Sequence, residues 1–120
     1  MTLRRVAAAG DVYWIDPNPV AGREMRDRHP FVVITPKEIN GLGIAMLVPI
    51  TSGGAFARGM GLTVPVSGQR ISGVAVCNQV RSFDLAARER DGTARYAETL
   101  DQSTIRQIIT RVVSVIDPEE

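Results

Sequence analysis

The apolar positions of this chain form short runs in its first two thirds. Residues 12–15, 31–35, 44–50, 62–66 and 73–83 are rich in aromatic and β-branched side chains, as β-strands are. Prolines or glycine-rich segments separate these runs, and no helical pattern lies between them. A parallel sheet with crossover helices is therefore excluded, and we expect a mainly β protein with a small, strongly curved antiparallel barrel.

The last third of the chain has a different period. From Asp101 to Ile116 the apolar residues at 105, 108, 109, 112, 113 and 116 fall on one face of a helix. Asp101 is placed to cap its N-terminus, and Pro118 ends it. We expect this stripe to pack on the barrel, with partner binding as the alternative.

The segment 16–30, between the first two predicted strands, is the part that folding explains least. It contains three prolines, three arginines and the only histidine. Ordering such a polar segment costs about 1–2 kcal/mol per residue and buries little apolar area, so long polar connections usually have a function. We interpret this segment as the functional surface of the protein. The glycine-rich segment 51–61 is either a second ligand-binding loop or only a turn.

Composition adds three limits. The chain has 120 residues, of which 44% are hydrophobic and 22% charged, as expected for a single domain over residues 1–120. All but one of the fourteen basic residues are arginines, which suit phosphate and carboxylate, although a coding bias explains this equally well. One cysteine, Cys77, and one histidine are too few for a usual zinc site, so we expect no metal and no cofactor. No signal peptide or membrane helix is present, and a cytoplasmic protein is expected.

Four sequence blocks together resemble one known family. They are Gly10-Asp-Val-Tyr-Trp-Ile-Asp-Pro-Asn-Pro, Gly22-Arg-Glu, Val48-Pro-Ile-Thr-Ser-Gly-Gly and Gly73-Val-Ala-Val-Cys-Asn-Gln-Val-Arg-Ser-Phe-Asp-Leu-Ala-Ala-Arg88. In this order and spacing they are similar to the MazF/PemK toxins of type II toxin–antitoxin systems, including ChpB-like members. The similarity runs from about residue 9 to the final helix.

This resemblance implies an SH3-like barrel with a C-terminal helix, assembled as a homodimer. It also implies a toxin that inhibits growth as a sequence-specific, metal-independent endoribonuclease. The substrate would be single-stranded mRNA, cut to 2′,3′-cyclic phosphate and 5′-hydroxyl ends. The implied partner is an antitoxin of the MazE/PemI type, with an acidic tail that covers the RNA site and with which the toxin binds DNA. Loops 17–30 and 51–61 of both subunits are expected near a shared RNA groove.

The resemblance also names candidate catalytic residues. Cleavage through the 2′-hydroxyl needs a proton acceptor, a proton donor for the leaving oxygen, and positive charge on the phosphate. Where the family commonly has an arginine before the proline of the second strand, this chain has His29, with Arg28 one residue earlier. Either Arg28 reaches the scissile phosphate or His29 shares the role, as an acid or base near neutral pH. Thr51 matches a threonine that binds the phosphate. Glu24 matches a loop glutamate that orients an arginine or transfers a proton, unless it makes only a surface salt bridge.

Further positions are candidates for substrate binding. Arg23 stands where some members have a loop histidine that contacts RNA, and Ser52 follows the catalytic threonine of the motif. Arg81 is placed to contact a phosphate or an antitoxin carboxylate.

Two positions depart from the PemK branch of the family. Asn78 replaces an aspartate proposed there as the general base, and Val76 replaces an arginine proposed as the acid. An amide cannot accept the proton, so we assign Asn78 and Gln79 to reading RNA bases. The alternatives are a catalytically weak member that binds RNA or antitoxin, and a CcdB-like gyrase inhibitor. The latter would need a tryptophan-bearing tail, whereas Trp14 lies in the first predicted strand.

Overall fold

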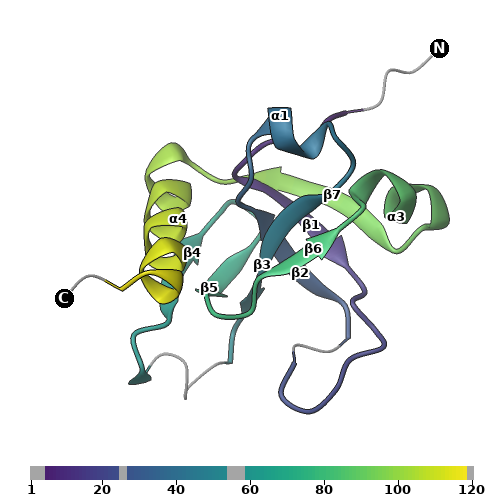
Figure 1. Cartoon of the computed structure of the whole chain (residues 1–120). Helices are drawn as coiled ribbons and strands as arrows, with labels where there is room; N and C mark the ends of the chain where they lie inside the picture. The colour runs from purple at the N-terminus through teal and green to yellow at the C-terminus, as the bar shows by residue number, and fades with distance from the viewer. Residues whose placement is uncertain (1–4, 25–26, 54–58, 119–120) are drawn as a thin grey trace.

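The computed structural model describes residues 5–24, 27–53 and 59–118 (Figure 1). In these ranges seven strands form one antiparallel sheet, and the chain ends in a helix. The strands are β1 (Asp11–Ile15), β2 (His29–Val33), β3 (Ala45–Thr51), β4 (Thr63–Ser67), β5 (Ser72–Val76), β6 (Arg81–Phe83) and β7 (Ala94–Thr99). The helices are α1 (Lys37–Asn40), α3 (Leu85–Asp91) and α4 (Gln102–Ile116).

The sheet has the order β4-β5-β3-β2-β1-β7, and β6 pairs with β3 beside that path. The predicted class, mainly β with a C-terminal helix, is confirmed. The predicted barrel is not closed, because β4 and β7 stand at opposite ends of this order and do not pair with each other.

A side chain bridges the two ends of the sheet. The carboxylate of Glu98, on β7, accepts hydrogen bonds from the backbone N–H groups of Gln69, Arg70 and Ile71 at 3.0, 2.8 and 2.6 Å. These three residues form the turn between β4 and β5. A Cβ at Gly68 would lie only 2.6 Å from a Glu98 carboxylate oxygen, so glycine leaves the room that this contact needs.

The single strand predicted over residues 73–83 is wrong. β5 pairs with the end of β3, at Ile50 and Thr51, whereas β6 pairs with its beginning, over residues 45–47. The chain leaves the sheet between these two pairings, so Asn78 lies in a turn rather than in a strand. This turn is where the polar residues interrupt the apolar pattern.

Alternation along the strands divides the core into two clusters. On β1, Val12 and Trp14 face the cluster beneath α4, whereas Tyr13 and Ile15 face the cluster that includes Leu85 of α3. Strands of period two therefore cover both faces of the sheet with apolar side chains.

Helix α4 begins as expected and packs along only part of its apolar stripe. The Asp101 carboxylate accepts a hydrogen bond from the Thr104 N–H at 2.8 Å, which confirms the predicted cap. The early part of the stripe is buried, at Ile105, Ile108 and Val112. Its last turns are not, since Val113 is 54% and Ile116 71% exposed. In the part of the chain that the structure describes, no helix has the length and apolar character needed to cross a membrane.

Candidate functional site

A pocket of about 390 Å³ lies between the loop that follows β1 and the turn that follows β5. Both segments lie toward the lower side of the sheet in Figure 1. The pocket is lined by Arg23, Glu24, Phe31, Pro49, Asn78, Gln79, Val80 and Arg81. Five predicted site residues thus come together although they are far apart in sequence.

The strand register explains how the pocket walls meet. Phe31 on β2 is the register partner of Pro49 on β3. Because side chains alternate along a strand, His29 and Thr51 lie on the same face as this pair. In an antiparallel ladder, two residues before Phe31 and two residues after Pro49 are displaced in the same direction. His29 and Thr51 are therefore the next positions on this face, beyond the pocket lining.

One ring nitrogen of His29 contacts the main chain of the loop. Its Nδ1 lies 3.2 Å from the carbonyl oxygen of Asp27. A carbonyl oxygen only accepts, so this contact requires a hydrogen on Nδ1. In the neutral ring the lone pair is then on Nε2.

The hydroxyl of Thr51 is also oriented by the main chain. Its Oγ1 accepts a hydrogen bond from the Gly53 N–H at 3.1 Å, and this leaves its own O–H to donate. The neighbouring strand β5 lies close to the Thr51 main chain, as Gly73 shows. A Cβ added at Gly73 would lie 2.6 Å from the Thr51 carbonyl oxygen.

Glu24 shapes the loop that carries Arg23. Its carboxylate accepts from the Ala21 N–H at 2.8 Å, and its own N–H donates to the Ala21 carbonyl at 3.1 Å. The two contacts close a tight turn in the loop. This geometry supports a role for Glu24 in holding Arg23 at the pocket wall.

Arg81 forms the opposite basic wall. Its guanidinium lies 5.1 Å from the centroid of the Phe83 ring, a cation–π distance, and the side chain is half-buried. Asn78, beside it, is exposed on the turn. The pocket therefore joins arginines suited to an anion with amides suited to the edge of a base.

Four predicted site residues do not line this pocket: His29 and Thr51, described above, and also Arg28 and Ser52. Arg28 and Ser52 are both exposed. Arg28 precedes His29 and Ser52 follows Thr51, so by strand alternation each is on the opposite face from that neighbour. Part of the predicted loop 51–61, residues 54–58, lies outside the described residues.

Sequence reasoning missed one residue that fixes the loop. Nη1 of Arg88, on α3, donates to the carbonyl of Asp16 at 3.0 Å, at the point where β1 ends. Its guanidinium also lies 4.5 Å from the Phe83 centroid. Arg88 was part of the family-like block, but no local signal separated it from the other arginines.

Cys77 precedes the turn and is buried, as predicted. Burial raises the pKa of its thiol to about 11. The thiol is therefore protonated and unreactive near neutral pH. Among the described residues no three histidine, cysteine or carboxylate side chains gather as a metal site would require.

Fold and site together define a small antiparallel β protein with a C-terminal helix and an arginine- and amide-lined pocket at the end of its sheet. Residues 8–116 match the family described as the PemK-like, MazF-like toxin of type II toxin–antitoxin systems, and the chain belongs to this family.

Individual relatives agree with this assignment. The chain is 33% identical to the endoribonuclease PemK of Escherichia coli over 84% of its length and 78% of that protein. It is 35% identical to the endoribonuclease toxin ChpB of Escherichia coli strain K12, over 81% of this chain and 87% of that protein. A crystal structure of MazE-MazF from Deinococcus radiodurans matches with a TM-score of 0.75 and 25% identity, covering 97% of this chain and 100% of that one.

Proposed function

We propose that this protein is the toxin of a type II toxin–antitoxin system and cleaves single-stranded mRNA at specific sequences, without a metal ion, in the cytoplasm. The observation that carries the proposal is the pocket that unites Arg23, Arg81 and Asn78, next to a histidine whose Nδ1 contacts a backbone carbonyl. The names of the relatives, endoribonucleases PemK and ChpB, support the same activity.

His29 is assigned to the first proton transfer. Its Nε2 takes the proton of the 2′-hydroxyl, and the 2′ oxygen attacks the adjacent phosphorus. The bond from phosphorus to the 5′ oxygen breaks, which leaves a 2′,3′-cyclic phosphate and, after protonation, a 5′-hydroxyl. A correctly placed base of this kind accelerates cleavage by roughly 10²–10⁴-fold.

The remaining residues bind the substrate. Arg23 and Arg81 neutralise phosphate oxygens, and the Thr51 hydroxyl donates to the phosphate under attack. Asn78 and Gln79 read the edges of unstacked bases through their amides. The leaving 5′ oxygen takes its proton from water, and Arg28, one residue before His29, is assigned to the charge of the scissile phosphate.

An antitoxin of the MazE/PemI type is the proposed protein partner. The similarity to a MazE-MazF crystal structure supports such a complex. The acidic tail would pair with the guanidiniums of Arg23 and Arg81, and occupation of the pocket would exclude RNA. The complex would then bind its operator DNA.

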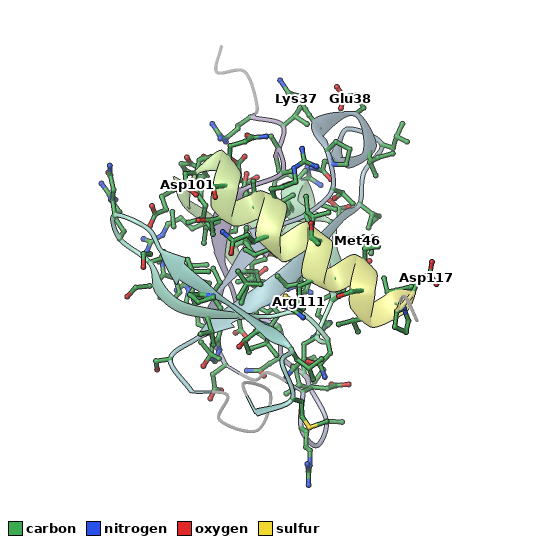
Figure 2. The ribbon with its side chains drawn as sticks, turned by 90° about the vertical axis from the view of Figure 1, so that its left-hand side faces the viewer. Lys37, Glu38, Met46, Asp101, Arg111 and Asp117 are labelled. Carbon is green, nitrogen blue, oxygen red and sulfur yellow. The ribbon has the colours of Figure 1, made fainter. Side chains whose placement is uncertain are left out.

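The exposed apolar side chains support a homodimer. Leu42, Ile44 and Met46, which lead from α1 into β3, are 85%, 51% and 36% exposed. Val113 and Ile116 are the uncovered end of the α4 stripe, which crosses the front of the molecule in Figure 2. Exposed apolar side chains are typical of protein interfaces when they gather in one patch, and we propose that these do. A homodimer through this surface would keep the pocket open, since none of these residues lines it. Sedimentation at micromolar concentration tests it, and a monomer would contradict it.

The decisive test is cleavage of a long single-stranded RNA by the purified protein in EDTA, with the fragment ends mapped. We expect discrete cuts with cyclic phosphate ends. His29→Asn is the sharpest variant, because its side-chain N–H can still donate to the Asp27 carbonyl, whereas an amide has no basic nitrogen to take a proton. It should retain RNA binding and lose cleavage. Arg28→Ala separates the neighbouring cation, and Arg90→Ala on the exposed side of α3 is the matched control. A folded protein that binds RNA and leaves it intact would overturn the nuclease assignment.

A further inference from the structure

The backbone immediately before His29 has an unusual conformation. Asp27 has φ of 64°, the only positive φ of a non-glycine residue among those described. This left-handed region is disfavoured for L-residues by roughly 1–2 kcal/mol, although aspartate and asparagine adopt it more readily than most. Such a conformation persists where neighbouring contacts hold it.

Two contacts hold the Asp27 main chain from opposite sides. Its N–H donates to the side-chain oxygen Oδ1 of Asn18 at 3.3 Å, and its carbonyl faces Nδ1 of His29 at 3.2 Å. Asn18 is itself fixed, because its N–H donates to the carboxylate of Asp16 at 3.1 Å. A chain of contacts therefore runs from the end of β1, across the neck of the loop, to the imidazole at the start of β2.

The direction of the Asp27 carbonyl depends on this conformation. Rotating φ of Asp27 from the left-handed to the right-handed region reorients the peptide planes on both sides of its Cα. The carbonyl and the amide N–H would then no longer meet His29 and Asn18 together. The tautomer of His29 is thus set by a backbone carbonyl, one of the groups that commonly orient a histidine ring.

We infer that Asp27 and Asn18 are positioning residues that keep the hydrogen of His29 on Nδ1 and so present Nε2 to the RNA. This inference rests on the proposed role of His29 as the base. Asp27 acts through its main chain, so its side chain matters only through the φ angle that it tolerates. Asn18 acts through its side-chain oxygen.

The chain offers matched variants for each claim. Asp27→Gly removes the side chain but adopts positive φ freely, whereas Asp27→Val makes the same φ strongly unfavourable. Asn18→Asp keeps an acceptor oxygen for the Asp27 N–H, and Asn18→Ala removes it. The glycine and aspartate variants should behave like the wild type, and the valine and alanine variants should not.

The first readout needs no RNA. Because the chain has a single histidine, protein labelled with ¹⁵N-histidine gives one pair of imidazole nitrogen signals. In the neutral ring of the wild type, Asp27→Gly and Asn18→Asp, we expect Nδ1 to be the protonated nitrogen. In Asp27→Val and Asn18→Ala the signals should shift toward a mixture or toward Nε2–H. A wild-type ring protonated at Nε2, or a tautomer unchanged in both disruptive variants, would overturn the inference.

The second readout is the cleavage of a short RNA. We expect Asp27→Val and Asn18→Ala to lower kcat roughly tenfold to a hundredfold while KM stays close to the wild-type value, as expected when a catalytic group is misplaced. Circular dichroism excludes general unfolding as the cause. If KM rose and kcat did not fall, the two residues would shape the binding loop, and the positioning role would be wrong. A wild type with the expected tautomer that cuts no RNA would remove the proposed function, and with it the catalytic purpose of this contact chain, while the tautomer assignment would stand.

Discussion

Glu98 provides the most direct test of how the open sheet is held in its curved shape. Its carboxylate accepts three backbone hydrogen bonds from the turn between β4 and β5, at 2.6–3.0 Å. Hydrogen bonds to a charged group each contribute about 1.5–3 kcal/mol net, and three bonds on one half-buried carboxylate are not additive. We therefore expect Glu98→Ala to lower the free energy of unfolding by about 2–4 kcal/mol. For a chain of this size that corresponds to a fall in Tm of roughly 4 °C per kcal/mol, or roughly 8–16 °C in all.

Two further variants make the reasoning specific. Glu98→Gln keeps one carbonyl acceptor and turns an N–H₂ group toward other donors, so it should lose roughly half as much. Glu38→Ala, at an exposed carboxylate on α1, is the control and should change stability by less than about 0.5 kcal/mol. Hydrogen exchange supplies the local check. The amides of Gln69, Arg70 and Ile71 should exchange faster in Glu98→Ala under native conditions. Equal Tm values for the Glu98 and Glu38 variants, with unchanged exchange in this turn, would refute the idea that Glu98 stabilises the link between the two ends of the sheet.

The remaining predictions concern Tyr13, Cys77 and Gly73. The Tyr13 hydroxyl is buried without a hydrogen-bond partner among the described residues, so Tyr13→Phe should leave the free energy of unfolding unchanged or raise it by up to about 1 kcal/mol in a denaturant titration. Burial also raises the pKa of the Tyr13 hydroxyl from 10.0 to about 12. Between pH 10 and 12 only the unfolded chain releases this proton, so the wild type should lose stability as the pH rises through this range. The phenylalanine variant should lose less stability over the same range. The Cys77 thiol, with a pKa raised to about 11 by burial, should react with a thiol reagent near pH 8 only after unfolding, and rapid labelling of the native protein would contradict this. Gly73→Ala should destabilise the protein by at least about 2 kcal/mol more than Gly43→Ala and should reduce cleavage. Both glycines have positive φ, but of the two only Gly73 has backbone, the Thr51 carbonyl, where an added Cβ would lie. Similar melting curves for the two variants would argue against this prediction.

The elements that could be predicted are those with a strong local period. β1, β2 and β3 follow apolar runs, and α4 follows a stripe with an aspartate cap, so their types came directly from the pattern. β7 could not be found this way. Its residues include Arg95 and Glu98, because an edge strand is buried on part of one face only. α3 does have local signals, since the Asp84 carboxylate caps it and Gly92 ends it with φ of 83°, but its seven residues are too few for a clear stripe.

The candidate site likewise has a part that the sequence predicted and a part that it did not. The loop 16–30 was predicted from its excess of polar residues, and the pocket does use Arg23 and Glu24 from it. Arg28 was an equal candidate with His29 in the sequence, because adjacent residues share every local pattern. Strand alternation separates them, since it puts the imidazole on the face of Phe31.

By itself the sequence determined the strand-forming runs, the capped final helix, the position of the polar loop and the family to which the chain belongs. Hydrophobic alternation and helical periodicity are properties of neighbouring residues, and a family-like order of motifs is read along the chain. The tertiary structure decided which runs pair, that β5 and β6 share β3, and that Glu98 reaches the far turn. It also decided that Arg23 and Arg81 line one pocket and that the Asp27 carbonyl contacts the His29 ring. These contacts join residues far apart in sequence or depend on one backbone angle, and strand register and φ are settled by packing, which no local pattern encodes.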